Sequence, residues 1–250
     1  MDIIGRGFLA RNLACLAGRH HRVVAIAAGA SSTAATGADL DREADLVRDV
    51  ALRCRLEQRT VILFSTASHA LYGSTTAPVA EHDPVNPASA FGHHKLRLER
   101  LVAASGAPWL VLRVSHAVGP YQRSHQFFPA MVRAVGTGYV RVHRDAARDL
   151  IDVVTVVRTV DALAGAGISD EVINVATGLP HPVPDIVAAI ESALGRAATV
   201  HLVDAPPAAA TVSVAKLHHL IPGLGSPRDG AEDLHTLVHR YAPLYSTADP

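Results

Sequence analysis

Three hydroxyl-bearing residues near the end of an apolar strand are the first candidates for chemistry in this sequence. The strand is Val61–Phe64, and Ser65, Thr66 and Ser68 follow it directly. A hydroxyl both donates and accepts hydrogen bonds, so it can hold an oxygen atom of a ligand. We therefore treat all three as candidate site residues.

A helix that begins near Ala88 carries the second group of candidates. Phe91 and Lys95 are four residues apart, so they share one face of this helix. Lys95 supplies an ammonium group, whereas Phe91 can neither donate nor accept a proton. Acid–base chemistry at this face must therefore come from another group.

The N-terminus has the form of a dinucleotide-binding turn. A short apolar strand breaks at Gly5 and resumes as an apolar-periodic helix, which gives G-x-G-x-x-A in a strand–turn–helix context. The first glycine allows a tight turn, the second lets the backbone approach a pyrophosphate, and the alanine permits close helix packing. The candidate cofactor-binding residues of this turn are Gly5, Arg6, Gly7, Phe8, Leu9 and Ala10.

The charges that follow this turn bear on the choice of cofactor. A dinucleotide fold usually places an acid about 20 residues after the glycines, where it binds the ribose 2′-hydroxyl. No acidic residue occurs between Asp2 and Asp39, and Arg6 lies inside the turn. These two features favour a 2′-phosphate, so we expect NADP(H) in preference to NAD(H).

Together the motifs resemble those of the extended short-chain dehydrogenase/reductase family. Arg113, Gly119 and Pro120 match its Arg-x-x-Asn-Val-Tyr-Gly-Pro segment, and residues 148–153 and 171–178 match later segments in order. The resemblance implies an α/β fold with a Rossmann-type doubly wound parallel sheet and a small C-terminal substrate lobe. It also implies hydride transfer between a nicotinamide and a carbonyl carbon.

One segment departs from the family's usual length. Residues 24–30 resemble a later strand of the family that ends in Ala-Ala, and residues 38–52 resemble the helix after it. If so, a whole βαβ segment that usually contacts the adenosine ribose is missing. We therefore expect a sheet trimmed near the N-terminus, with the adenine end of the cofactor exposed.

The resemblance also assigns roles to individual residues. The implied catalytic residues are Ser68, Lys95 and Phe91, which stands where the family has a tyrosine. Further implied cofactor-binding residues are Ala28, Ser65, Thr66, Lys95, Val114 and Ser115. The implied substrate-binding residues are Ser68, His69, His116 and Tyr121.

Three functions follow from a site without the tyrosine. The first is an NAD(P)H-dependent ketoreductase for an aromatic, angucyclinone-type polyketide in antibiotic biosynthesis, whose ketone is polarised by a neighbouring phenol. The second is a nucleotide-sugar epimerase, dehydratase or reductase, with His93, His94 or His116 as the acid–base group. The third is a non-catalytic NADP-binding sensor. We favour the first, because an epimerase must both abstract and return protons.

Composition excludes several other classes. Lys+Arg and Asp+Glu both number 23, so the neutral balance gives no global attraction to nucleic acid or anionic membrane. The two cysteines have no metal-type spacing and the histidine pairs make poor metal clips, so we expect no metal site and a cytoplasmic protein.

We expect one domain over residues 1–250 that binds a small-molecule substrate. Its dinucleotide-binding core would lie at about 1–125 and 150–175, and its substrate lobe at about 126–149 and 176–250. Family members often dimerise through the helix that carries the Tyr/Lys pair, so a homodimer through the Phe91–Lys95 helix is a further expectation.

Overall fold

A parallel sheet of five strands forms the core of the structure, a computed structural model that describes residues 1–29, 36–87, 89–224 and 233–246. Neighbouring strands follow the order β1-β2-β3-β4-β9. Most are short apolar runs such as Val-Val-Ala-Ile, the composition expected for strands covered on both faces. The five strands are β1 (Asp2–Ile4), β2 (Val23–Ile26), β3 (Thr60–Thr66), β4 (Trp109–Val114) and β9 (Glu171–Val175).

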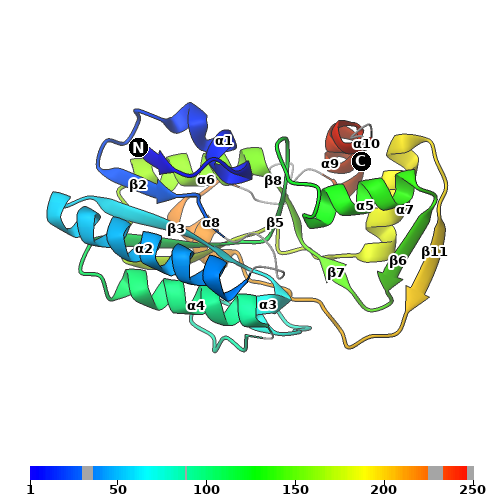
Figure 1. Cartoon of the computed structure of the whole chain (residues 1–250), viewed down its shortest axis with the longest axis horizontal. Coiled ribbons are helices and arrows are strands. Elements are labelled where there is room, and N and C mark those ends of the chain that lie inside the picture. Colours follow the sequence, from blue (N-terminus) through cyan, green and yellow to red (C-terminus); the bar gives the residue numbers. More distant parts are fainter. Residues whose placement is uncertain (30–35, 88, 225–232, 247–250) are drawn as a thin grey trace.

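Helices cover both faces of the sheet (Figure 1). Alternate residues of β2 belong to different cores, with Val23 and Ala25 on one face and Val24 and Ile26 on the other. The first face is covered by α1 (Phe8–Leu13), the 3-10 helix η1 (Ala14–Leu16), α6 (Val153–Gly165) and α8 (Ala215–Leu220). The second face is covered by α2 (Gly37–Glu57) and α4 (Ala90–Ala103).

The first connection in the sheet differs in hand from the next two. The chain moves from β1 to β2 through α1, and from β2 to β3 through α2, in the same direction along the sheet. Because α1 and α2 lie on opposite faces, the two connections have opposite hands. Parallel β–α–β connections are right-handed in about 98% of cases, so the β1–α1–β2 connection is an exception.

A missing pair of strands explains this exception. In a doubly wound sheet two strands lie outside the first one, and the strand order reverses beside it. In the described part of the chain no strand pairs with the outer edge of β1, and β2 takes the inner neighbouring position. The sheet is therefore trimmed as expected, and α1 keeps the face it would have in the complete fold.

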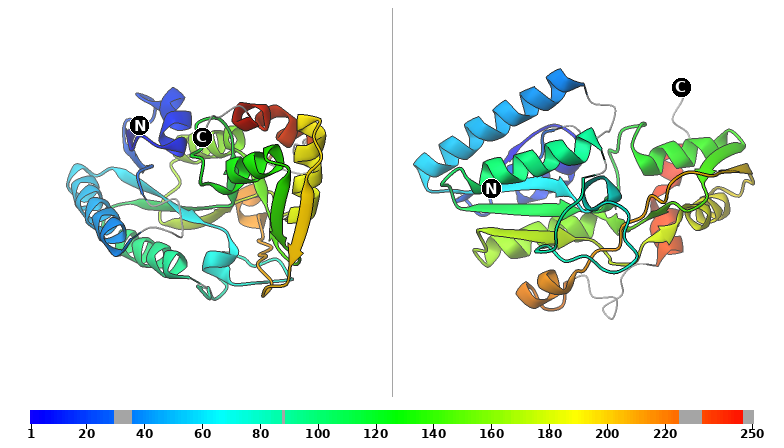
Figure 2. Two further views of the ribbon diagram at one scale, coloured as in Figure 1. Left: turned by 45° about the vertical axis from the view of Figure 1, so that its right-hand side comes forward. Right: turned by 90° about the horizontal axis from the view of Figure 1, so that it is seen from below.

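A second apolar core lies in the C-terminal half (Figure 2). It packs α5 (Phe127–Gly136), α7 (Val183–Leu194) and α9 (Leu234–Tyr241) against β6 (Tyr139–His143). The mostly exposed strand β11 (Thr199–Val203) pairs with β6 in parallel. The boundaries expected for a core and a substrate lobe stay a prediction. The remaining elements are α3 (His69–Tyr72), β5 (His116–Val118), β7 (Ala147–Arg148), β8 (Leu150–Asp152), β10 (His181–Pro182) and α10 (Pro243–Ser246).

None of the helices in the described ranges combines the length and the apolar character needed to cross a membrane.

Helix α4 approaches α3 closely through Gly92. A Cβ built at Gly92 would lie 1.7 Å from the carbonyl oxygen of Ala70. Only glycine permits this approach, because a backbone oxygen cannot move aside without moving its helix. The contact fixes the residues of α4 relative to Ser68, the N-cap of α3.

We predict that Gly92→Ala destabilises the protein by about 2 kcal/mol, because the new methyl group overpacks a backbone contact. The matched control is Gly136→Ala on α5, where no atom lies within 4 Å of the added Cβ. The free energy of unfolding of the control should rise by up to about 1 kcal/mol, because alanine has a higher helix propensity than glycine. Urea unfolding measures both changes, and an unchanged midpoint for Gly92→Ala would contradict the predicted contact.

Candidate functional site

Ser68 keeps its hydroxyl proton available at the end of β3. Its Oγ accepts hydrogen bonds from Thr66 Oγ1 at 2.9 Å and from the backbone N–H of Ala70 at 3.3 Å. A hydroxyl has two acceptor lone pairs and one proton, so these bonds leave the proton for a ligand oxygen. Ser68 is thus a hydrogen-bond donor at the strand end.

Ser65 has a different environment from Ser68. It is buried, and its hydroxyl donates to the buried carboxylate of Glu99 on α4. Its side chain is therefore used inside the protein. A contact between Ser65 and a cofactor, which the sequence predicts, would have to involve the backbone.

A buried network joins α4 to three strand ends. Arg113 Nη2 donates to Glu99 Oε2 at 2.7 Å, and its Nη1 donates to the hydroxyl of Tyr72 at 2.8 Å. Tyr72 in turn donates to Asn174 Oδ1 at 2.7 Å, and burial raises the pKa of its phenol. Tyr72 therefore cannot replace the missing tyrosine, because its hydroxyl is already bonded both ways.

Lys95 lies where the sequence places it, on the same face as Phe91. The Nζ atom is 5.6 Å from the centroid of the Phe91 ring. It also donates to Glu43 Oε1 at 2.7 Å, and Nε2 of His94 lies 3.1 Å from Glu43 Oε2. All three polar side chains are at most 8% exposed.

Sequence reasoning missed Glu43, although a signal for it exists. Glu43 lies on α2 in helical register with the buried residues Val47, Val50 and Cys54. A carboxylate on the apolar stripe of a helix needs a buried partner. Two partners of Glu43, His94 and Lys95, come from α4, which packs beside α2 (Figure 1).

The glycine turn has the geometry that a phosphate group requires. Gly5 has a φ of +139°, and a Cβ there would lie 2.4 Å from the carbonyl oxygen of Ala27, so only glycine fits. Gly7 is the N-cap of α1 without a side-chain capping bond, and a Cβ there would meet nothing within 4 Å. The first N–H groups of α1 are therefore open to an anion.

The other residues of this turn divide by burial. Phe8 and Ala10, on α1, are buried, Leu9 is partly buried, and Arg6 is exposed. Ala28, just beyond β2, is partly exposed. The exposed side chain of Arg6 can therefore contact a ligand directly. The buried residues can contact a ligand only through their backbone.

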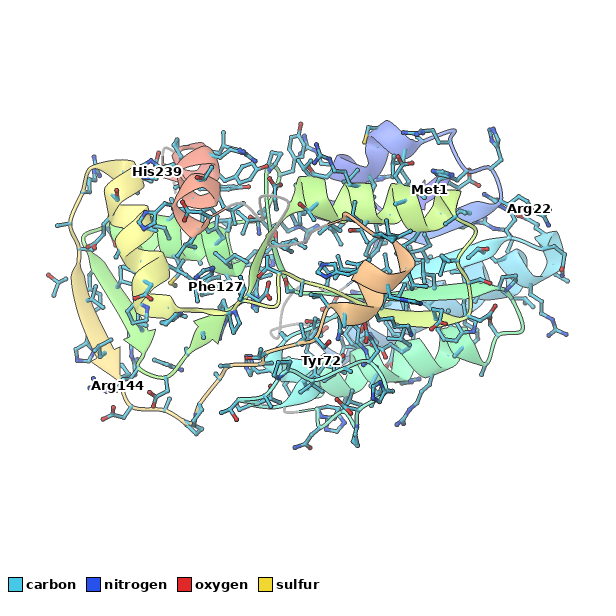
Figure 3. All side chains as sticks on the ribbon, turned by 180° about the vertical axis from the view of Figure 1, so that it is seen from behind. Met1, Arg22, Tyr72, Phe127, Arg144 and His239 are labelled. Carbon is cyan, nitrogen blue, oxygen red and sulfur yellow. The ribbon has the colours of Figure 1, made fainter. Side chains whose placement is uncertain are left out.

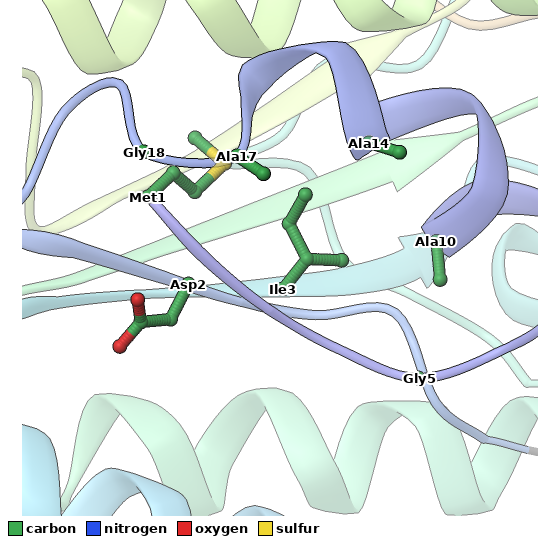
Figure 4. A pocket seen from close by; sticks show the side chains of 8 residues that line it. All are labelled: Met1, Asp2, Ile3, Gly5, Ala10, Ala14, Ala17 and Gly18. Atoms are coloured by element: carbon green, nitrogen blue, oxygen red, sulfur yellow. The ribbon is translucent and has the colours of Figure 1, made fainter.

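A pocket of about 490 Å³ continues from this turn along the outer edge of β1 (Figure 4). It is lined by none of the residues expected to be catalytic, Ser68, Phe91 and Lys95. The pocket occupies the side of β1 where a complete fold would carry its outer strands. It is lined by Met1, Asp2, Ile3, Gly5, Ala10, Ala14, Ala17 and Gly18.

A second polar centre combines His69, His116 and Arg148. Burial lowers the pKa of His116 to about 3, and the nearby Arg148 and His69 add to this shift. Burial, followed by Arg148, also lowers the pKa of His69. Phe127, labelled in Figure 3, meets both the His116 ring at 5.6 Å and the Arg148 guanidinium at 5.4 Å.

Arg148 in this centre has an unusual set of partners. Its Nη1 donates to the backbone carbonyls of Ala147 and Ala208 at 2.7 and 2.6 Å. Within the described residues no carboxylate lies within 4 Å of it, and burial lowers its pKa. The sequence matched the Arg148 segment but did not place Arg148 in the site.

The remaining candidates lie in two different places. Ser115 follows buried Val114 and donates to Asp149 at 2.9 Å, next to His116. Tyr121, in contrast, stacks under the Arg11 guanidinium at 3.7 Å and is 48% exposed. The structure therefore brings His69 and His116 together and places Tyr121 against α1 instead.

Comparison with solved structures shows the same fold. RMD from Pseudomonas aeruginosa complexed with NADPH matches at 17% identity and a TM-score of 0.77, over 97% of this chain and 99% of that one. MoeE5 in complex with UDP-glucuronic acid and NAD matches at 20% identity and a TM-score of 0.75, over 95% and 83%. UDP-glucuronic acid 4-epimerase from Bacillus cereus in complex with NAD matches at 20% identity and a TM-score of 0.76, over 96% and 78%.

Sequence comparison identifies the family. No curated protein matches the chain. The model of the NAD dependent epimerase/dehydratase family matches residues 14–176, which is more than half of the chain and begins just after the glycine turn. The chain belongs to the NAD dependent epimerase/dehydratase family.

Proposed function

We propose that this chain is a nicotinamide-dependent oxidoreductase that acts on a sugar linked to a nucleoside diphosphate. Arg148 carries the proposal. Arg148 is partly buried, so its charge without a carboxylate partner is costly, and a bound anion would reduce that cost. Phosphate is the anion that an arginine fork binds best, because two N–H groups can donate to it at once.

This proposal differs from the ketoreductase that the sequence favours. A flat aromatic polyketide brings no phosphate to Arg148, whereas a nucleotide sugar brings a diphosphate. Structural relatives in complex with UDP-glucuronic acid or UDP-glucose support the same choice. Among the histidines expected to replace the tyrosine, His94 bonds to Glu43 and His93 is exposed. His116 is the one of the three that lies with Arg148 and His69, and because its lowered pKa keeps the imidazole neutral at pH 7, within this proposal it binds the substrate by a hydrogen bond and is not the proton donor.

The residues present fit the nicotinamide half of a dinucleotide. The turn at Gly5 and Gly7 would hold the pyrophosphate, Lys95 would donate to ribose hydroxyls, and the Ser68 proton would bond to the reacting oxygen. When bound, the nicotinamide supplies or accepts the hydride. Within this proposal NADP(H) is preferred over NAD(H) because Arg6 is exposed beside the turn, and titration with both cofactors tests that preference.

We predict that Arg148→Gln weakens binding of UDP and UDP-sugars roughly tenfold to a hundredfold, because a charged hydrogen bond is lost. The control is Arg144→Gln, which removes an exposed arginine of the same lobe that pairs with Asp204 at 3.0 Å. The control should bind like the wild type. Isothermal titration calorimetry measures both, and equal affinities for all three proteins would refute the role of Arg148.

A second candidate function, the reduction of an aromatic polyketide ketone, is favoured by Phe91. A ketone beside a phenol is polarised by its own hydrogen bond, so hydride delivery needs mainly positioning. Among family members without the tyrosine, the chain most resembles the angucyclinone ketoreductase of simocyclinone biosynthesis. That resemblance depends mainly on the missing tyrosine.

Phe91→Tyr separates the two candidates. For a nucleotide sugar we predict that kcat rises roughly a hundredfold or more, because a phenol near Lys95 adds a general acid–base group. For an aromatic ketone that activates itself, kcat should stay unchanged. NADPH oxidation with both substrate classes measures this, and Phe91→Tyr/Lys95→Met is the control that should lose the gain. Turnover of ketones alone would contradict the nucleotide-sugar proposal.

The lowered pKa of His116 predicts a pH-dependent stability. Between about pH 6.5 and 3 the unfolded chain binds a proton at His116 that the folded chain does not, so stability falls as the pH is lowered through this window. Between pH 7 and 4 the free energy of unfolding of the wild type should fall. We predict that this fall is about 1–3 kcal/mol smaller for His116→Gln. Urea unfolding at several pH values measures it, and parallel curves would contradict the buried neutral histidine.

A further inference from the structure

Glu43 is a buried carboxylate on α2 that contacts Lys95, and none of the site roles expected from the sequence falls on it. Its Oε1 accepts from Lys95 Nζ at 2.7 Å, and its Oε2 lies 3.1 Å from His94 Nε2. We infer that Glu43 is a positioning residue for Lys95, and that cofactor hydroxyls bind to Lys95 only while Glu43 holds it. This inference depends on the proposed nicotinamide-dependent function.

The donors of Lys95 support this role. An ammonium group has three N–H donors, and the bond to Glu43 is its one hydrogen bond to a described residue. Two donors are therefore left for a ligand. Lysine has a flexible four-carbon stem, so an unfixed ammonium would lose conformational entropy on binding. Glu43 removes that freedom before the ligand arrives.

The charges of the pair indicate which ligand atoms it takes. The formal charges of Glu43 and Lys95 cancel, so the pair attracts an anion less than a lone lysine would. Hydroxyl oxygens, such as those of a ribose, suit such a neutral donor pair. Phosphate groups suit Arg148 instead, which has no carboxylate within 4 Å among the described residues.

Two further residues lie against the Glu43 carboxylate. Nε2 of His94, from the same helix that carries Lys95, lies against Oε2. Gly29, after the end of β2, approaches Oε1 so closely that a Cβ built there would be 2.2 Å from that oxygen. An alanine at position 29 would therefore push the carboxylate away without changing either member of the pair.

A purely structural ion pair is the competing explanation. Buried ion pairs often contribute little net stability, and replacing both partners by apolar residues is often neutral, while removing one partner is destabilising. A double substitution therefore separates the two roles. It restores folding in either case, but it restores cofactor binding only if the pair is structural.

The experiment measures the Kd for NADPH by calorimetry and the thermal unfolding midpoint for each variant. The single variants are Glu43→Gln, Lys95→Met and Gly29→Ala, and the double variant is Glu43→Leu/Lys95→Met. Gly37→Ala is the matched control for Gly29→Ala, because a Cβ there would meet nothing within 4 Å.

We expect all three single variants to raise the Kd roughly tenfold to a hundredfold, the effect of a lost charged hydrogen bond. The double variant should unfold at the wild-type temperature yet keep the high Kd of Lys95→Met. Wild-type affinity in Glu43→Gln would overturn the inference while leaving the proposed function intact. Wild-type affinity in the double variant would overturn both the inference and the ribose contact proposed for Lys95. No NADPH or NADH binding by the wild type would overturn both.

Discussion

The close approach of α4 to its neighbours is the constraint on which the site depends. One side of this helix carries three residues at intervals of four positions: Phe91, Lys95 and Glu99. This side faces the rest of the protein. Glu99 joins α4 to the sheet through Arg113, Lys95 joins it to α2, and Gly92 lets it touch α3. Because each contact is buried, a shift of α4 would leave charges unpaired, and such charges are costly.

This packing creates two polar centres of different charge. The centre on α4 combines a carboxylate with an ammonium, and the centre around Arg148 is cationic with two histidines whose pKa values are lowered by burial. Within the proposed function, cofactor hydroxyls bind at the first centre and the diphosphate of the substrate binds at the second. A purely aromatic substrate would leave the charge of the second centre uncompensated, which is why we propose a nucleotide sugar.

The sequence was sufficient to predict what depends on local patterns. Apolar runs located the strands, and the Ala-Ala segment after Val24 predicted the trimmed sheet that the strand order confirms. Partners that come from distant segments could not be predicted. Glu43 meets Lys95 across 52 positions, and Tyr72 meets Asn174 across 102, so no spacing rule connects them. Tyr121 follows a matched segment, yet its positive φ of 74° turns it toward Arg11.

The trimmed sheet changes how a dinucleotide can be held. In a complete doubly wound fold the ligand crosses the point where the strand order reverses, and both halves of the sheet contact it. Here β1 is at the edge, so the strands that would contact the adenosine are absent from the described part of the chain. Affinity must then come from the glycine turn and from the nicotinamide side. A rigid Lys95 then contributes more to affinity, because fewer contacts offset the entropy that the ligand loses on binding.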